Sequence, residues 1–160
     1  MDMSGEQTIR RPQAVTWSSI TDPRVLKACI PGCESMDKVG DNEYELVMGA
    51  KVGPVSAKFK GKITLADVDA PHAYTLIFEG QGGVAGFAKG QATVRLLPDG
   101  ETTRLQYTAR AMIGGKLAQV GSRLVDGVAK KLADNFFTKF NQHVSGEAVK
   151  DEGRRAKGEG

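Results

Sequence analysis

Apolar and polar side chains alternate through most of the chain between residues 44 and 113, which is the period of a β-strand. A weaker alternation precedes it near the N-terminus. Turn-forming residues such as Pro71 and the Pro98-Asp99-Gly100 sequence interrupt the pattern. About seven strands are predicted, and six of them can be placed: residues 3–10, 44–52, 55–65, 74–78, 88–96 and 103–113. The short breaks favour antiparallel hairpins.

The period changes after the last of these strands, where apolar residues recur every three or four positions. This predicts one unbroken helix from Lys116 to Val144, about 43 Å long at the usual rise per residue. Two shorter helices are expected after the first strand. Pro12 is suited to begin the first of them. Asp22-Pro23 supplies an N-cap and a first helical residue for the second, which ends near Ile30.

Together these elements predict an α+β fold, in which a curved antiparallel sheet wraps around one long C-terminal helix and two short helices follow the first strand. A chain of 160 residues has the size of one domain, which we assign to residues 1–145 as a ligand-binding domain. Residues 146–160 have almost nothing to bury, so we expect a disordered polar tail that begins a linker.

Many of the positions expected to face the helix carry unusually small side chains. They are Ala50, Ala57, Gly61, Ala88, Gly90, Ala92, Ala109 and Ala111. Protein interiors are close-packed, so a row of small inward residues indicates either close contact between backbones or an internal space for a ligand. The sequence leaves both interpretations open.

If there is a cavity, its wall is expected to be apolar and to hold a ligand mainly by burial of apolar surface. Tyr107 would supply one polar contact that orients the ligand, and Phe87 would gate the entrance beside the glycine-rich segment 80–86. The predicted ligand-binding residues are Met48, Val52, Phe59, Ile63, Leu76, Phe78, Phe87, Tyr107, Ala109, Leu117, Val120, Leu124 and Val128.

Charge and reactive side chains exclude several functions. A net charge of +3 with no basic aromatic platform does not indicate a nucleic-acid partner. Apolar runs are too short to cross a bilayer, and no export signal precedes them. Cys29 and Cys33 do not have metal-site or redox spacing, and two distant histidines form no catalytic set, so we predict no metal and no catalytic residues.

Two further motifs have competing interpretations. The segment from Gly80 to Ala85 matches a loose dinucleotide fingerprint, but a strand rather than a helix follows it, so a flexible loop at the rim of the cavity is favoured. Lys51, Lys58, Lys60 and Lys62 form a basic stripe on the outward face of the sheet. It is either a solvated face that protects the sheet or a dock for an anionic membrane or an acidic partner.

Several segments resemble the CoxG family of carbon monoxide dehydrogenase accessory proteins, within the START-like helix-grip superfamily. The most specific are Cys29-Ile30-Pro31-Gly32-Cys33 and Val52-Gly53-Pro54-Val55, supported by residues 114–121 and by Phe136-Phe137. The resemblance covers residues 3–141. It implies an accessory protein of a molybdenum-dependent carbon monoxide dehydrogenase that attaches the enzyme to the membrane. It also implies a ligand tunnel between the sheet and the long helix.

From these observations we hypothesise a quinone carrier without catalytic activity or a covalent cofactor. It would take an isoprenoid quinone, menaquinone before ubiquinone, from the bilayer and present it to the dehydrogenase. It would lie in the cytoplasm at the inner face of the cytoplasmic membrane, held there by a C-terminal extension such as family members often carry. The alternatives are a tether with a filled core and no ligand, or a START-like enzyme such as a cyclase.

Overall fold

The computed structural model describes residues 1–146, so the predicted tail lies outside the described residues except for Gly146. Twelve elements follow one another along this part of the chain. They are β1 (Asp2–Ile9), α1 (Gln13–Ile20), α2 (Pro23–Cys29), β2 (Cys33–Gly40), β3 (Glu43–Val52), β4 (Val55–Asp69), β5 (Ala73–Gln81), the short 3₁₀ helix η1 (Gly83–Ala85), β6 (Phe87–Asp99), β7 (Thr102–Gly114), α3 (Lys116–Gln119) and α4 (Ser122–Val144).

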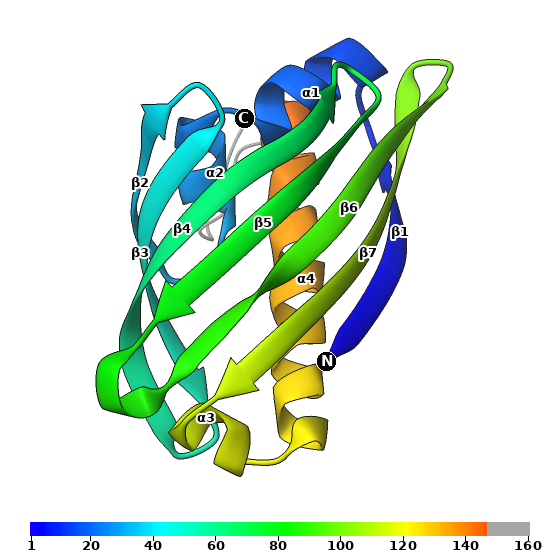
Figure 1. Cartoon of the computed structure of the whole chain (residues 1–160). Helices are drawn as coiled ribbons and strands as arrows, with labels where there is room; N and C mark the ends of the chain where they lie inside the picture. Colours follow the sequence, from blue (N-terminus) through cyan, green and yellow to red (C-terminus); the bar gives the residue numbers. More distant parts are fainter. Residues whose placement is uncertain (147–160) are drawn as a thin grey trace.

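Seven antiparallel strands form one curved sheet in the order β1-β7-β6-β5-β4-β3-β2, and α4 lies against its concave side (Figure 1). Consecutive strands from β2 to β7 are neighbours, as the short turns predicted, and β1 pairs with β7 to form the edge opposite β2. All six placed strands are confirmed, several with extra residues at their ends. The predicted α+β class, with its curved sheet and long C-terminal helix, is also confirmed.

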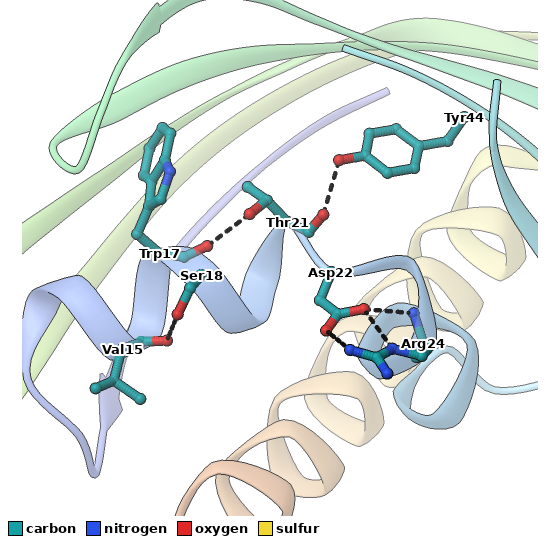
Figure 2. A network of polar contacts seen from close by, with 7 residues as sticks. All are labelled: Val15, Trp17, Ser18, Thr21, Asp22, Arg24 and Tyr44. Carbon is teal, nitrogen blue, oxygen red and sulfur yellow. Dashed lines mark hydrogen bonds and ion pairs between the residues drawn. The ribbon is translucent and has the colours of Figure 1, made fainter. Parts of the chain in front are cut away.

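Both short helices are present, and their connection ties them to the sheet. The Asp22 carboxylate caps α2 by accepting a hydrogen bond from the backbone N–H of Arg24 at 2.8 Å. Its hydrogen bonds with the Arg24 side chain keep the pKa of the Asp22 carboxyl below its ordinary value. The Tyr44 hydroxyl, on β3, donates to the carbonyl oxygen of Thr21 at 2.7 Å. Figure 2 shows both contacts, which fix the α1–α2 connection over one end of the sheet.

The prediction of one unbroken helix over residues 116–144 is wrong. The helical segment divides into α3 and α4, which are separated by Val120 and Gly121. Gly121 has a φ of 100°, a conformation that an α-helix does not contain and that residues with a Cβ rarely adopt. The chain therefore changes direction at Gly121, and the side chains before it do not continue the face of α4.

Strand β2 is the one that the alternation did not locate. It lies at the edge of the sheet, and Met36 is its only buried residue. Its apolar residues, Cys33, Met36 and Val39, recur every three positions, and its pairing with β3 is irregular at both ends, so the period of two is absent. The tightest packing lies near the end covered by α1 and α2, where Ile9 and Phe140 are fully buried and Leu96 is 1 % exposed.

Candidate functional site

Two adjoining cavities lie between the concave side of the sheet and α4, each with a volume of about 390 Å³. Both volumes fall in the range typical of small-molecule sites. The first cavity extends toward α3, where Leu117 and Ile113 border it. The second extends toward the α1–α2 end, where Ile20 and Leu26 border it. Six residues border both: Ile30, Met48, Ile63, Leu76, Ala129 and Leu132.

The row of small residues explains most of this space. Six of the eight border a cavity: Ala50, Gly61, Ala88, Ala92, Ala109 and Ala111. Gly90 instead serves close contact, because a Cβ there would collide with the backbone carbonyl of Arg110. Ala57 is paired with Ala50 but borders neither apolar cavity. Both explanations of the small residues therefore apply: most of them leave internal space, and Gly90 allows close contact between backbones.

Ten of the thirteen predicted ligand-binding residues line the cavities, and three do not. Those that do are Met48, Val52, Phe59, Ile63, Leu76, Phe78, Tyr107, Ala109, Leu117 and Val128. They come from β3, β4, β5, β7, α3 and α4, so the sheet supplies most of the wall. The exceptions are Phe87, Val120 and Leu124.

Phe87 lies away from the cavities. Strand β6 begins at this residue, and because Ala88 faces the first cavity, the alternation of a strand turns Phe87 to the opposite side of the sheet. Its ring packs against Gly114, and the Lys89 ammonium lies 5.9 Å from the ring centroid. The expected gate is therefore a residue of the outer face.

Val120 and Leu124 border a separate groove on the outside of the molecule. Val120 lies in the break before α4, and Leu124 lies at the flank of the inward face of α4, one position before Val125, which borders the first cavity. Leu124 is 39 % exposed and lies directly over Gly53, in the turn between β3 and β4. Val128 borders both this outer groove and the first cavity, so one layer of side chains separates the cavity from solvent there.

All three tyrosines of the chain border the second cavity, although the sequence indicated only Tyr107. The ring of Tyr107 stacks on Phe137 with 5.7 Å between centroids, and burial raises the pKa of its hydroxyl. Tyr74 is 4 % exposed and makes an edge-to-face contact with Trp17 at 5.5 Å. Burial strongly raises the pKa of the Tyr74 hydroxyl. The sequence could have indicated Tyr74 as a cavity residue, because it lies on the same face of its strand as Leu76 and Phe78.

Among residues 1–146, no buried charged or histidine side chain lines either cavity. Lys62 and Glu79 also border the first cavity, but both are exposed, and they are opposite each other in the register of β4 and β5. The same described range holds no cluster of three or more metal-ligating side chains. Burial raises the pKa of the Cys29 thiol to about 11, which disfavours its nucleophilic thiolate form at neutral pH. The lining that residues 1–146 provide suits an apolar molecule.

The basic stripe on the outer face lies among acidic residues. Lys58 forms an ion pair with Glu34 at 3.3 Å, and Lys62 is in register with both Glu45 and Glu79. This arrangement favours the interpretation of a solvated face. No helix within the described part of the chain combines the length and the apolar character that a membrane span requires.

Comparison with known proteins gives a family and a fold. The sequence model of the CoxG family, described as the G subunit of carbon monoxide dehydrogenase, matches residues 5–145. A conserved protein from Geobacillus kaustophilus shares 32 % identity, and the match covers 91 % of this chain and 96 % of that one, with a TM-score of 0.86. The sequence comparison with curated proteins gave no match.

Two more distant solved structures confirm the START-like helix-grip fold. A START superfamily protein from Mycobacterium smegmatis has a TM-score of 0.69 at 12 % identity, with 91 % of this chain and 97 % of that one covered. The aromatase/cyclase ZhuI of Streptomyces sp. R1128 has a TM-score of 0.63 at 12 % identity, with 92 % and 99 % covered. At these identities the likeness concerns the fold alone.

Proposed function

Because the chain belongs to the CoxG family, we propose that it is an accessory protein of a molybdenum-dependent carbon monoxide dehydrogenase. In this role it carries an isoprenoid quinone, menaquinone first, in its internal cavities and links the enzyme to the cytoplasmic face of the membrane. The quinone is cargo rather than a covalent cofactor, and the protein itself is not an enzyme.

The observation that carries the proposal is the pair of adjoining apolar cavities. Small side chains at Ala88, Ala109 and Ala111 keep this space open, where ordinary core residues would have filled it. An apolar ligand is stabilised there by about 25 cal/mol for each Å² of apolar surface that it buries. A tether alone has no need for such a space, and a cyclase needs an acid–base residue, whereas the described lining holds no buried charged or histidine side chain.

One end of the molecule has the surface that a membrane contact requires. The η1 segment, α3, the β3–β4 turn and the start of α4 lie together there (Figure 1). Val84 is 86 % exposed at this end and Leu124 is 39 % exposed. Arg123 and Lys131 border the groove beside Leu124. Apolar side chains inserted among anionic headgroups, with about 1 kcal/mol from each cation near the surface, would hold the first cavity against the bilayer.

The test is to purify the full chain from a host that makes menaquinone, extract it with organic solvent and examine the extract by mass spectrometry. We expect a near-stoichiometric amount of isoprenoid quinone. Ala111→Leu fills part of the first cavity and should lower the yield at least several-fold. Met112→Leu changes the next residue, which is 59 % exposed and borders neither cavity, and should leave the yield unchanged.

An empty extract, followed by no thermal stabilisation when phylloquinone is added, would overturn the carrier proposal and leave the tether. Equal yields from Ala111→Leu and Met112→Leu would place any quinone outside the cavity. Recovery of the purified carbon monoxide dehydrogenase on the immobilised full chain, with and without quinone, tests the partner separately.

A further inference from the structure

The hydroxyl group of Tyr74 has no hydrogen-bond partner among residues 1–146, although its side chain is 4 % exposed and borders the second cavity. The Tyr74 ring packs edge-to-face against Trp17 and belongs to the apolar core, which offers the hydroxyl no acceptor. A buried hydroxyl that pairs with nothing costs about 1–3 kcal/mol, so such groups in proteins normally have a partner. In this protein, the cavity is where a partner can be supplied.

The other two tyrosines of this cavity differ from Tyr74 in a way that makes them controls. The Tyr44 hydroxyl is already committed to the carbonyl oxygen of Thr21 at 2.7 Å. Tyr107 is only partly buried, and its hydroxyl lies beside the backbone of Gly5 on β1. Water can reach a partly buried hydroxyl, so the Tyr107 hydroxyl has no need of a ligand atom. Of the three, Tyr74 alone combines full burial with an unused donor.

We propose that the Tyr74 hydroxyl donates a hydrogen bond to an uncharged carbonyl oxygen of the carried ligand and thereby fixes which end of the ligand lies under the α1–α2 connection. This inference rests on the proposed function and deepens it. The carbonyl end occupies the second cavity beside Tyr74, and the apolar tail passes Met48 and Leu76, which border both cavities, toward α3.

The same geometry selects against charged amphiphiles. Burying a carboxylate or phosphate without a cation is very unfavourable, and no cationic side chain from the described residues borders the second cavity. A ketone or quinone oxygen needs only one donor, which Tyr74 supplies. The ligand class is therefore a long apolar molecule with a neutral carbonyl head, as in an isoprenoid quinone, rather than a fatty acid or a phospholipid.

Three probes separate the hydrogen bond from simple burial: phylloquinone, the phytyl methylnaphthalene of the same shape without carbonyl oxygens, and palmitate. Dissociation constants are measured for the full chain and for Tyr74→Phe, Tyr44→Phe and Tyr107→Phe. Tyr74→Phe should weaken phylloquinone binding about tenfold and leave the naphthalene unchanged. The two control variants should not distinguish the probes, and palmitate should bind weakly throughout.

The position of the head group has its own measurement. Trp17 is the only tryptophan, and its ring contacts Tyr74. A quinone ring beside Tyr74 should strongly quench Trp17 fluorescence, whereas a quinone ring near Leu117, at the far end of the first cavity, should not. In the empty protein, Tyr74→Phe should leave the unfolding midpoint unchanged or raise it, because it removes an unpaired hydroxyl.

The outcomes separate the two proposals. If the unaltered chain binds neither phylloquinone nor the naphthalene, the proposed function fails. If phylloquinone binds but Tyr74→Phe weakens both apolar probes equally or neither of them, the carrier stands and the hydrogen bond is wrong. A lower unfolding midpoint for empty Tyr74→Phe would show that the hydroxyl already has a partner, such as a buried water, and would also overturn the inference.

Discussion

The two ends of the sheet are packed differently although the same strands run through both. The closed end comprises the residues near α1 that border neither cavity; there Ile9 and Phe140 are fully buried, and the Thr16 hydroxyl donates to Thr103 Oγ1 at 3.2 Å. Toward α3, the hollow end, the same strands present alanine and glycine to α4 and enclose space. One end therefore supplies the stability that lets the other remain unfilled.

Residues of the same type therefore contribute differently to stability at the two ends. A leucine at the closed end contacts protein on all sides, while a leucine beside the cavities has empty space on one side. Because dispersion contacts are short-ranged, the second leucine contributes less to folding. Its contribution becomes larger only when a ligand fills the space. Each prediction below compares these two environments.

The largest effect is expected from truncating a leucine at the closed end. Leu96 on β6 is 1 % exposed and borders neither cavity, whereas Leu76 on β5 borders both. Leu96→Ala should lower the free energy of unfolding by about 3–5 kcal/mol and Leu76→Ala by about 1–2 kcal/mol, because only the first opens a new void. Urea unfolding of the ligand-free protein measures both. Equal losses would mean that the space beside Leu76 is filled.

Much of the fold follows from local signals in the sequence. The Asp22-Pro23 pair defined the start of α2, and the alternation in β3 and β4 placed most of the cavity wall. Strand β2 was missed because Cys33, Met36 and Val39 recur every three positions and irregular pairing with β3 breaks the period of two. The break before α4 was missed because Gly121 lies within an apolar repeat that continues on both sides.

The site was harder to predict than the fold, because it depends on where a strand begins and on which polar groups are already paired. Extending β6 by one residue turned Phe87 to the outer face of the sheet. Tyr74 lay on the predicted face, but whether its hydroxyl has a partner depends on residues far away in the sequence. Periodicity carries no information about whether a hydroxyl is already paired.

The next effect concerns pH and the two cysteines. Burial raises the pKa of the Cys29 thiol from 9.0 to about 11, so the folded state favours the neutral thiol. The stability that this provides is complete below pH 9 and is lost as the pH rises toward 11, by at most about 2–3 kcal/mol. Urea unfolding across this window should show a smaller decline for Cys29→Ala than for the unaltered chain.

Thiol labelling of the native protein compares the accessibility of the buried Cys29 with that of the partly buried Cys33. Cys33 is only partly buried, and the pKa of its thiol is also raised by burial. A maleimide reagent should modify Cys33 first, and modification of Cys29 should require unfolding. Rapid labelling of Cys29 in the native protein would show that the closed end opens as readily as the hollow end.

The smallest effect, with opposite signs at two positions, is expected where α4 begins at the hollow end. A Cβ would meet nothing within 4 Å at either Gly121 or Gly127, but only Gly121 has a positive φ. Gly121→Ala should therefore cost about 1–2 kcal/mol of backbone strain, whereas Gly127→Ala, inside the helix, should stabilise the protein by about 0.5–1 kcal/mol. Thermal unfolding of the two variants measures this difference. A lower stability of Gly127→Ala would contradict the expectation that the surroundings of Gly127 are open. A higher stability would show that Gly127 weakens the part of α4 that covers the cavity.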